Sequence, residues 1–274
     1  MNLIIQYYQV KYENQPQNII NKRQAEITKC LKENLNNEMI THVHILFESK
    51  NDEEFMYSEG INNEYPNFNK IVIHQLGTRL TYQNILNYAS TYLKDKWCIY
   101  MHADLYLNKV DPKSVEELYT KSEQNVYALT AHHPTKCAKQ GIKCGCTRQW
   151  FTKQGLRTPT IDGFIFKAPL NQELINNVDH IIHRMGSENR MIAFFKKYNY
   201  SVTCPHMIFY TTHQHLIKIF APQHSTWVEM SGECKPLSYY QKIHLKQAGQ
   251  PYEKKIVGGG IPFYDGTVEV VNKL

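Results

Sequence analysis

Short apolar runs alternate with segments of helical periodicity along the first 204 residues of the chain. The apolar runs, which are typical of buried strands, span residues 3–8, 43–47, 71–76, 97–101, 126–130, 163–167 and 201–204. Helical periodicity covers residues 19–35, 81–93, 174–183 and 188–198, and a capping-box pattern at Ser114 and Glu117 predicts one more helix start. Strands separated by helices pair mainly in parallel, with the helices on the faces of the sheet. The pattern therefore predicts an α/β fold of the Rossmann type, with a mainly parallel sheet flanked by helices.

The segment between the second and third predicted strands is polar. Acidic and amide residues dominate positions 51–54, and a Tyr-Pro pair follows at residues 65–66. We therefore expect a polar loop here. The chain contains neither an internal repeat nor a low-complexity segment.

The alternation weakens beyond His215. Prolines are frequent there, and the run Gly258-Gly259-Gly260 indicates a turn beside a short strand over residues 267–271. The run lacks the following helix and the Lys-Ser/Thr pair of a phosphate loop. We therefore expect one domain over residues 1–215 and an irregular C-terminal extension over residues 216–274 that packs on or covers the functional site.

Composition narrows the class of protein. Of the 274 residues, 42% are hydrophobic and 20% are charged, as in globular proteins, and the net charge of +6 favours an anionic ligand. The basic residues are scattered, so we expect no nucleic-acid partner. No apolar stretch approaches the roughly 20 residues of a membrane span, and residues 3–5 are too short for a signal-peptide core. We expect a soluble, cytoplasmic protein.

The seven cysteines are used unevenly. Cys30 and Cys98 fall within apolar helix and strand patterns, where a thiol acts as a small hydrophobe, which favours a reducing compartment. A loop near His132 and His133 contains three more, at Cys137, Cys144 and Cys146. Their spacing matches no standard zinc motif, so a flexible or disulfide-prone loop is the favoured interpretation, with a structural zinc site as the alternative.

An acidic residue follows the most apolar of the predicted strands. Residues 97–101 run directly into His102-Ala103-Asp104. Ligands of α/β folds bind at the carboxyl ends of the strands, and a carboxylate oxygen there suits a hard divalent cation. Asp104 is therefore a candidate metal ligand, and a turn-forming carboxylate is the alternative interpretation.

Four short motifs, in this order along the chain, resemble those of a known enzyme class. They are Met101-His102-Ala103-Asp104-Leu105, Asp162-Gly163-Phe164, Glu188-Asn189 and His213-Gln214-His215. The order resembles that of the GT-A nucleotide-sugar glycosyltransferases. More narrowly, it is similar to a group whose strand-end motif is Ala-Asn-Ser-Asp-Ile and which carries a C-terminal His-x-His. The chain departs from that group at His102, which replaces an Asn, and at Glu188, which replaces an Asp.

The resemblance implies a GT-A-like catalytic domain that moves a sugar from a nucleoside-diphosphate sugar, with a UDP-sugar favoured, to a glycan or glycoprotein acceptor. A divalent cation, Mn²⁺ or Mg²⁺, would act as a Lewis acid on the leaving diphosphate. Its ligands would be Asp104 and His215, with His213 as a further candidate. Arg79, His102 and Asp104 would bind the donor nucleotide.

The resemblance also implies a base that takes the proton of the acceptor hydroxyl. Glu188 is the candidate and Asp162 its rival, and inversion follows if this assignment is right. Asn189 and Arg190 would orient the base or the acceptor.

Each of these residues has a structural alternative. Glu188 follows Ser187, a good N-cap, and an acid in a first helical turn is stabilised by the helix dipole whatever its function. Asp162 could form a turn before its glycine, Arg79 could be a solvated surface residue, and the two histidines could lie on the polar face of a strand. Three other functions stay open: a non-catalytic nucleotide- or glycan-binding module, a zinc-stabilised interaction protein built on the cysteine loop, and a nucleotidyltransferase. The last should carry a Gly-rich loop near the first strand, where residues 9–12 have none.

Overall fold

The computed structural model describes residues 1–12, 15–132, 161–182, 187–205, 208–213 and 269–270. The strands are β1 (Asn2–Ile5), β2 (His42–Phe47), β3 (Ile71–Gln75), β4 (Trp97–Met101), β5 (Leu105–Leu107), β6 (Asn125–His132), β7 (Ile161–Lys167), β8 (Ser201–Cys204), β9 (Thr211–His213) and β10 (Glu269–Val270). The helices are α1 (Gln17–Leu35), α2 (Lys50–Ser58), α3 (Tyr82–Tyr92), α4 (Pro112–Tyr119), α6 (Gln172–Asn177) and α7 (Ser187–Lys197), and a short 3₁₀ helix spans Phe68–Lys70.

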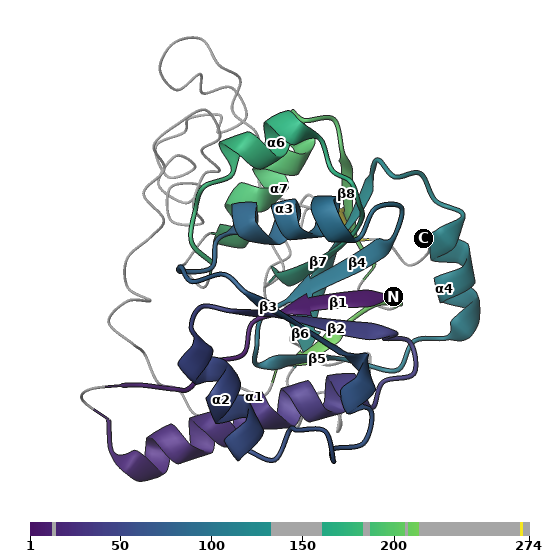
Figure 1. Ribbon diagram of the computed structural model, residues 1–274. Helices are drawn as coiled ribbons and strands as arrows, with labels where there is room; N and C mark the ends of the chain where they lie inside the picture. Colours follow the sequence, from purple (N-terminus) through teal and green to yellow (C-terminus); the bar gives the residue numbers. More distant parts are fainter. Residues whose placement is uncertain (13–14, 133–160, 183–186, 206–207, 214–268, 271–274) are drawn as a thin grey trace, which may run out of the picture.

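The strands form a curled, mostly parallel sheet, which confirms the predicted α/β class (Figure 1). Its order is β10-β8-β6-β7-β4-β1-β2-β3. Strands β1 to β4 run parallel to their neighbours within this group, whereas β7 is antiparallel to both β4 and β6. The short strand β9 pairs with β5 and with β6. The reversed strand β7 matters for the site, because its first residues lie at the edge where its neighbour β4 ends.

Helices cover both faces of the sheet. In Figure 1, α3, α6 and α7 lie above it and α1 and α2 lie below. Each face has its own buried cluster, and β4 contributes to both: Cys98 and Tyr100 point to the first, Trp97, Ile99 and Met101 to the second. A strand that is buried on both faces reads as a continuous apolar run, which explains why residues 97–101 were easy to recognise as a strand.

Helix starts follow their capping residues. Thr81 and Asn84 form a reciprocal capping box at the start of α3, as the predicted start at Thr81 required. The capping box expected at Ser114 is wrong, because α4 begins at Pro112 with Asp111 as its N-cap. The predicted helix 174–183 is shorter than expected, since α6 ends at Asn177.

The expected polar loop over residues 51–54 is also wrong, because these residues belong to α2. Ser49 accepts a hydrogen bond from the Asp52 backbone N–H, and Asp52 and Glu53 lie in the first turn, where the helix dipole favours acids. Only Met56 of this helix is buried. The helix therefore lacks an apolar stripe, the signal by which sequence periodicity finds helices.

The remaining expectations concern the C-terminal part of the chain, the cysteine loop and membrane spans. The end of the chain adds β10 parallel to β8, which agrees with a strand near residues 267–271. The cysteine loop with Cys137, Cys144 and Cys146, the glycine run and most of the extension 216–274 lie outside the described residues. Within the described part, no helix is long and apolar enough to cross a membrane.

Candidate functional site

Polar residues gather where the parallel strands end. Gln6 follows β1, Glu48 follows β2, and His102 to Asp104 follow β4. Two helices, α3 and α7, begin at the same edge, as shown by a hydrogen bond from the Tyr82 hydroxyl, at the start of α3, to Oε1 of Glu188, at the start of α7. This is the edge of an α/β sheet at which ligands bind.

Asp104 is buried and carries two cationic partners. Its Oδ2 accepts a hydrogen bond from the Arg23 guanidinium at 2.5 Å and lies 2.8 Å from Nε2 of His213. Arg23 comes from α1 and His213 from β9. Burial alone would raise the pKa of Asp104, but His213 and Arg23 outweigh it and hold that pKa well below its usual range. Despite the opposing effect of burial, Asp104 also raises the pKa of His213.

One carboxylate oxygen of Glu188 has three polar neighbours. Its Oε1 lies 3.1 Å from Nε2 of His102 and accepts hydrogen bonds from the hydroxyls of Ser187 at 2.7 Å and Tyr82 at 3.3 Å. Although burial opposes both shifts, the pair lowers the pKa of Glu188 and raises that of His102 to about 9. At neutral pH the two side chains therefore form an ion pair.

Asp162 differs from both other acids. Its Oδ2 is buried and has no hydrogen-bond partner among the described residues. Burial raises the pKa of Asp162, and the charges of His213 and His102 offset only part of this rise. A carboxylate with a raised pKa and an uncommitted oxygen is suited to accept a proton or a hydroxyl hydrogen bond.

Gly163 fixes the position of Asp162. A Cβ at Gly163 would lie 2.5 Å from the carbonyl oxygen of Tyr100, so only glycine lets β7 approach β4 this closely. The His102 backbone N–H then donates to the Asp162 carbonyl at 3.3 Å. Asp162 is thus held by the strand ladder, and the alternative of a simple turn before glycine is wrong.

Arg79 lies at the margin of the site. Its Nε is 3.6 Å from Oε1 of Glu48, and its side chain is 56% exposed. Glu48 is itself fixed, because the same oxygen accepts hydrogen bonds from the Gln6 side chain and the Leu80 backbone N–H. Burial and the charge of Asp104 raise the pKa of Tyr8, and the charges of Arg23 and Arg79 offset part of this rise.

The remaining predicted residues are placed differently. Arg190 is buried on α7, where its guanidinium packs over the Phe194 ring and lies 3.4 Å from a carboxylate oxygen of Asp179. Asn189 is in α7, but its side chain lies outside the described residues, as does His215. His213 lies in the short strand β9, as the structural alternative expected, and its ring contacts Asp104.

Arg23 and Tyr82 belong to the site but were not expected there. For Arg23 a signal was available: with Ile20, Ile27 and Leu31 it falls on the apolar stripe of α1, where a charged residue should not be buried without a partner. Its partners are Asp104 and Glu26. Tyr82 had no comparable signal, because a buried tyrosine at a helix start is an ordinary core residue.

The donor set bears on metal binding. The described residues contain no cluster of three or more His, Cys, Asp or Glu side chains arranged around a single metal position. Asp104 and His213 do bring a carboxylate oxygen and an imidazole nitrogen within 2.8 Å, and Mn²⁺ accepts both ligand types. The described part of the chain therefore offers two candidate ligands for a divalent cation, which in this arrangement contact each other.

Neither a protein-family model nor a curated protein matches this sequence significantly. Among solved structures, it is similar to a mannosyltransferase from Pyrobaculum calidifontis in complex with GDP-Man and Mn²⁺, with 10% identity and a TM-score of 0.47. The match covers 79% of this chain and 57% of that one, so the chain spans little more than half of that enzyme's length. It is also similar to HddC from Yersinia pseudotuberculosis complexed with GMP-PN, with 11% identity, a TM-score of 0.47 and coverage of 78% and 93%. Both scores are below 0.5, so we argue function from the site residues.

Proposed function

We propose that this protein is a glycosyltransferase that moves a sugar from a nucleoside-diphosphate sugar, with a UDP-sugar favoured, to a hydroxyl group of a glycan or glycoprotein. The proposal rests on a difference in pairing among three acids that lie at the same edge of the sheet. Asp104 and Glu188 are each paired with cationic side chains, whereas Asp162 keeps a buried, uncommitted oxygen. Cationic side chains are needed to bind an anionic leaving group, and an acid with an available oxygen is needed beside them to remove a proton.

The cationic half of the site would receive the diphosphate. Arg79 and His102 would contact it as donors, and Arg23 would keep Asp104 ionised and oriented. Asp104 and His213 would hold Mn²⁺ or Mg²⁺, with His215 as a further ligand from outside the described residues. When bound, the cation would supply Lewis-acid stabilisation of the charge that grows on the leaving phosphate.

We assign the base to Asp162 and not to Glu188. Oε1 of Glu188 already accepts hydrogen bonds from two hydroxyls and lies beside His102, and the lowered pKa of Glu188 makes it a weak proton acceptor. Asp162 has the raised pKa and the free oxygen that the task requires. Glu188 would instead hold His102 in its cationic form beside the diphosphate, while Asn189 and Arg190 would support the acceptor side from α7.

The step implied by this arrangement is a single displacement. Asp162 removes the proton of the acceptor hydroxyl as its oxygen bonds to the anomeric carbon. The bond from that carbon to the diphosphate oxygen breaks, and its electron pair leaves with the nucleoside diphosphate. Attack from the face opposite the leaving group inverts the configuration at that carbon.

The test is release of nucleoside diphosphate from a panel of UDP- and GDP-sugars with Mn²⁺ and simple glycoside acceptors. We expect release by the wild type and a loss of about 100-fold in Asp104→Asn and Asp162→Asn. Glu117→Gln is the matched control, because this exposed acid lies on α4, at the opposite edge of the sheet (Figure 1). Release that is equal in all four proteins would contradict the assignment of Asp104 and Asp162. Pyrophosphate as the product would indicate a nucleotidyltransferase. Tight nucleotide binding without turnover would indicate a binding module.

A further inference from the structure

Strand β3 forms one end of the sheet. Within the described residues it pairs with β2 on one side and with no strand on the other. Successive residues of a parallel ladder direct their backbone N–H and C=O groups alternately to one neighbouring strand and to the other. The Leu76 N–H, just after the strand, bonds to the Phe47 carbonyl of β2 at 2.8 Å. The even-numbered residues of β3 therefore address β2, and Ile71, Ile73 and Gln75 direct their main-chain groups outward.

This edge lacks the usual protection against pairing. Natural proteins blunt a free strand edge with charged residues, proline or a bulge, or they cover it. The sequence of β3, Ile-Val-Ile-His-Gln, contains no Lys, Arg, Asp, Glu or Pro, and its register with β2 is continuous. The preceding Lys70 is committed elsewhere, because its amine donates hydrogen bonds to the carbonyls of Leu35 and Asn37 at the end of α1. The strand is therefore suited to pairing with a further strand.

The side chains beside the edge are incompletely buried on both faces of the sheet. Ile71 and Ile73 pack against the core cluster on the side of α1 and α2, but each keeps part of its surface exposed. On the opposite face, the ring of His74 lies 5.6 Å from that of Tyr92, a residue of α3 that is 62% exposed. Burial of this surface would stabilise an additional strand at the edge.

The charges at the two ends of β3 indicate which strand fits. Gln75, at the end of the strand, donates a hydrogen bond of 2.5 Å to Oε2 of Glu53 on α2, so this end is acidic. Lys70 precedes the strand, so the other end is basic. An antiparallel copy of β3 brings the basic end of each copy to the acidic end of the other, whereas a parallel copy would place like charges together. The edge is therefore complementary to itself.

We propose that β3 is the interface between two copies of this chain, paired antiparallel about a twofold axis at Ile73, so that the sheet continues from one copy into the other. In this register Ile73 faces Ile73 of the other copy and Ile71 faces Gln75. The two Ile73 residues exchange their main-chain hydrogen bonds, and each Gln75 N–H donates to the Ile71 carbonyl of the other copy. The Ile71 N–H takes no part, because it is bonded to the Phe68 carbonyl. This inference does not depend on the proposed function.

The test is the oligomeric state of the full chain, measured by sedimentation equilibrium over a range of concentrations. We expect a dimer with twice the 32.2 kDa mass of one chain. Ile73→Lys and Ile73→Glu each place like charges opposite each other at the twofold axis, so each should weaken the dimer by about tenfold or more. An equimolar mixture of the two variants should restore it. Tyr119→Lys is the matched control, because it replaces a 53% exposed hydrophobic residue on α4, and it should leave dimerisation unchanged.

A second pair of variants separates a loss of pairing from a loss of fold. Gln75→Pro removes an outward N–H that the ladder with β2 does not use, a position in which an edge strand tolerates proline. Gln75→Ala loses the same side chain, including its bond to Glu53, but keeps the N–H. We expect both variants to have the circular dichroism of the wild type, and Gln75→Pro to dimerise about tenfold more weakly than Gln75→Ala.

Three results would overturn the inference. The first is a wild type that stays monomeric up to about 1 mM. The second is a dimer that Ile73→Lys and Gln75→Pro leave unchanged, which would place the interface on another surface. The third is slow hydrogen exchange of the Ile73 and Gln75 amides in the monomer, which would show that another segment of the same chain covers the edge.

Discussion

The guanidinium of Arg23 donates a hydrogen bond of 2.5 Å to Oδ2 of Asp104, a residue 81 positions further along the chain. Both side chains are about nine-tenths buried, at 8% and 10% exposed. The contact joins the first helix of the fold to the end of strand β4. It places a permanent positive charge beside Asp104, the acid that we expect to hold the divalent cation.

Removal of Arg23 should therefore destabilise the protein. Arg23→Met leaves Asp104 buried with one partner fewer, and loss of one member of a buried pair costs about 3 kcal/mol of unfolding free energy. Urea denaturation measures this change. The double variant Arg23→Met with Asp104→Asn should recover only part of the loss, because Asp104 no longer leaves a buried carboxylate without its guanidinium, whereas Glu26 and His213 each still lose a charged partner. A double variant with the two losses added would contradict a direct coupling.

Gly163→Ala should damage both stability and activity. The added Cβ would lie 2.5 Å from the Tyr100 carbonyl oxygen, so β7 must move away from β4 and carry Asp162 with it. We expect a loss of about 2 kcal/mol, typical of overpacking, together with a fall in kcat. Gly60→Ala is the control: its surroundings are open and only its φ of +78° is strained, so it should cost less, about 1 kcal/mol, and leave kcat unchanged. Equal costs would contradict the close-approach argument.

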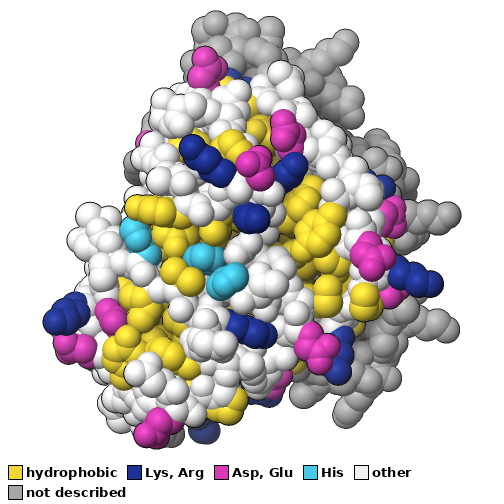
Figure 2. All heavy atoms as spheres, turned by 45° about the vertical axis from the view of Figure 1, so that its right-hand side comes forward, with side chains coloured by type: hydrophobic (Ala, Val, Ile, Leu, Met, Phe, Trp, Pro, Cys, Tyr) yellow, Lys and Arg dark blue, Asp and Glu magenta, His cyan; other side chains and the backbone are white. Residues whose placement is uncertain are grey.

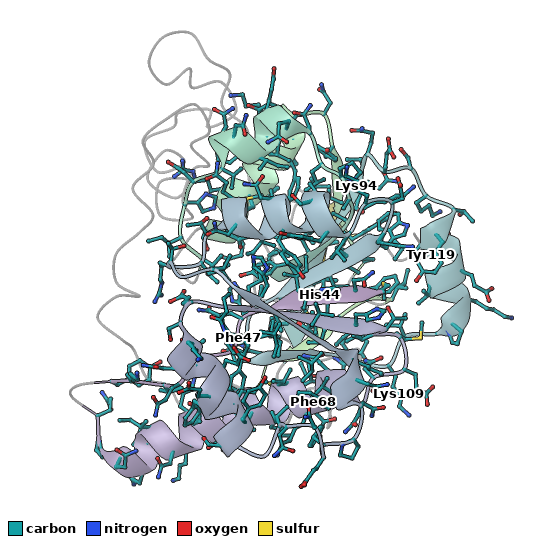
Figure 3. All side chains as sticks on the ribbon, viewed as in Figure 1. His44, Phe47, Phe68, Lys94, Lys109 and Tyr119 are labelled. Carbon is teal, nitrogen blue, oxygen red and sulfur yellow. The ribbon has the colours of Figure 1, made fainter. Side chains whose placement is uncertain are left out.

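His44 should make stability fall in acid. The residue lies in the middle of β2 (Figure 3), where burial, helped by the charge of His42, lowers its pKa to about 4. Because the folded-state pKa is below the unfolded value of 6.5, the folded protein excludes a proton that the unfolded chain binds. The contribution of neutral His44 to the free energy of unfolding is complete above pH 6.5 and is lost as the pH falls from 6.5 towards 4. The Tm difference between pH 7 and pH 5 should thus be smaller in His44→Gln than in the wild type.

Chelation tests the expected cation. With EDTA we expect binding of UDP or GDP, measured by calorimetry, to weaken at least tenfold, and added Mn²⁺ to restore it. Asp104→Asn should bind the nucleotide with the same affinity in EDTA and in Mn²⁺, because a ligand and its charge are lost. The exposed control Glu117→Gln should respond to EDTA as the wild type does. A wild type that binds the nucleotides equally well in EDTA would assign diphosphate neutralisation to Arg79 and His102 alone.

Aromatic contacts between β3 and α3 lie outside the site, and they are an example of packing that the sequence did not predict. Histidine side chains group among hydrophobic ones on the face shown in Figure 2. The rings of His74, on β3, and of Tyr88 and Tyr92, on α3, pack together, with 4.9 Å between the centroids of His74 and Tyr88. Such contacts between β3 and α3 depend on tertiary packing, and periodicity within either segment does not reveal them.

Strands β1, β2 and β4 were predictable because they are buried on both faces, and α1 and α3 because each carries an apolar stripe. Helix α2 was not predictable in this way, since a surface helix with only Met56 buried has almost no periodic signal. The acids Asp104, Asp162 and Glu188 were found from their positions at strand and helix ends. Which of them is paired depends on partners more than 80 residues away, such as Arg23 and His213, and no local pattern encodes that.

The reversal of β7 has one more consequence. Because this strand runs against its neighbours, an acid near its first residue meets acids that follow the parallel strands. Asp162 is consequently part of regular structure, with its peptide bonded to the His102 backbone, and needs no ordered loop to aim it. The group that we expect to take the proton thus belongs to a strand that is paired on both sides, so that substrate entry need not await its alignment.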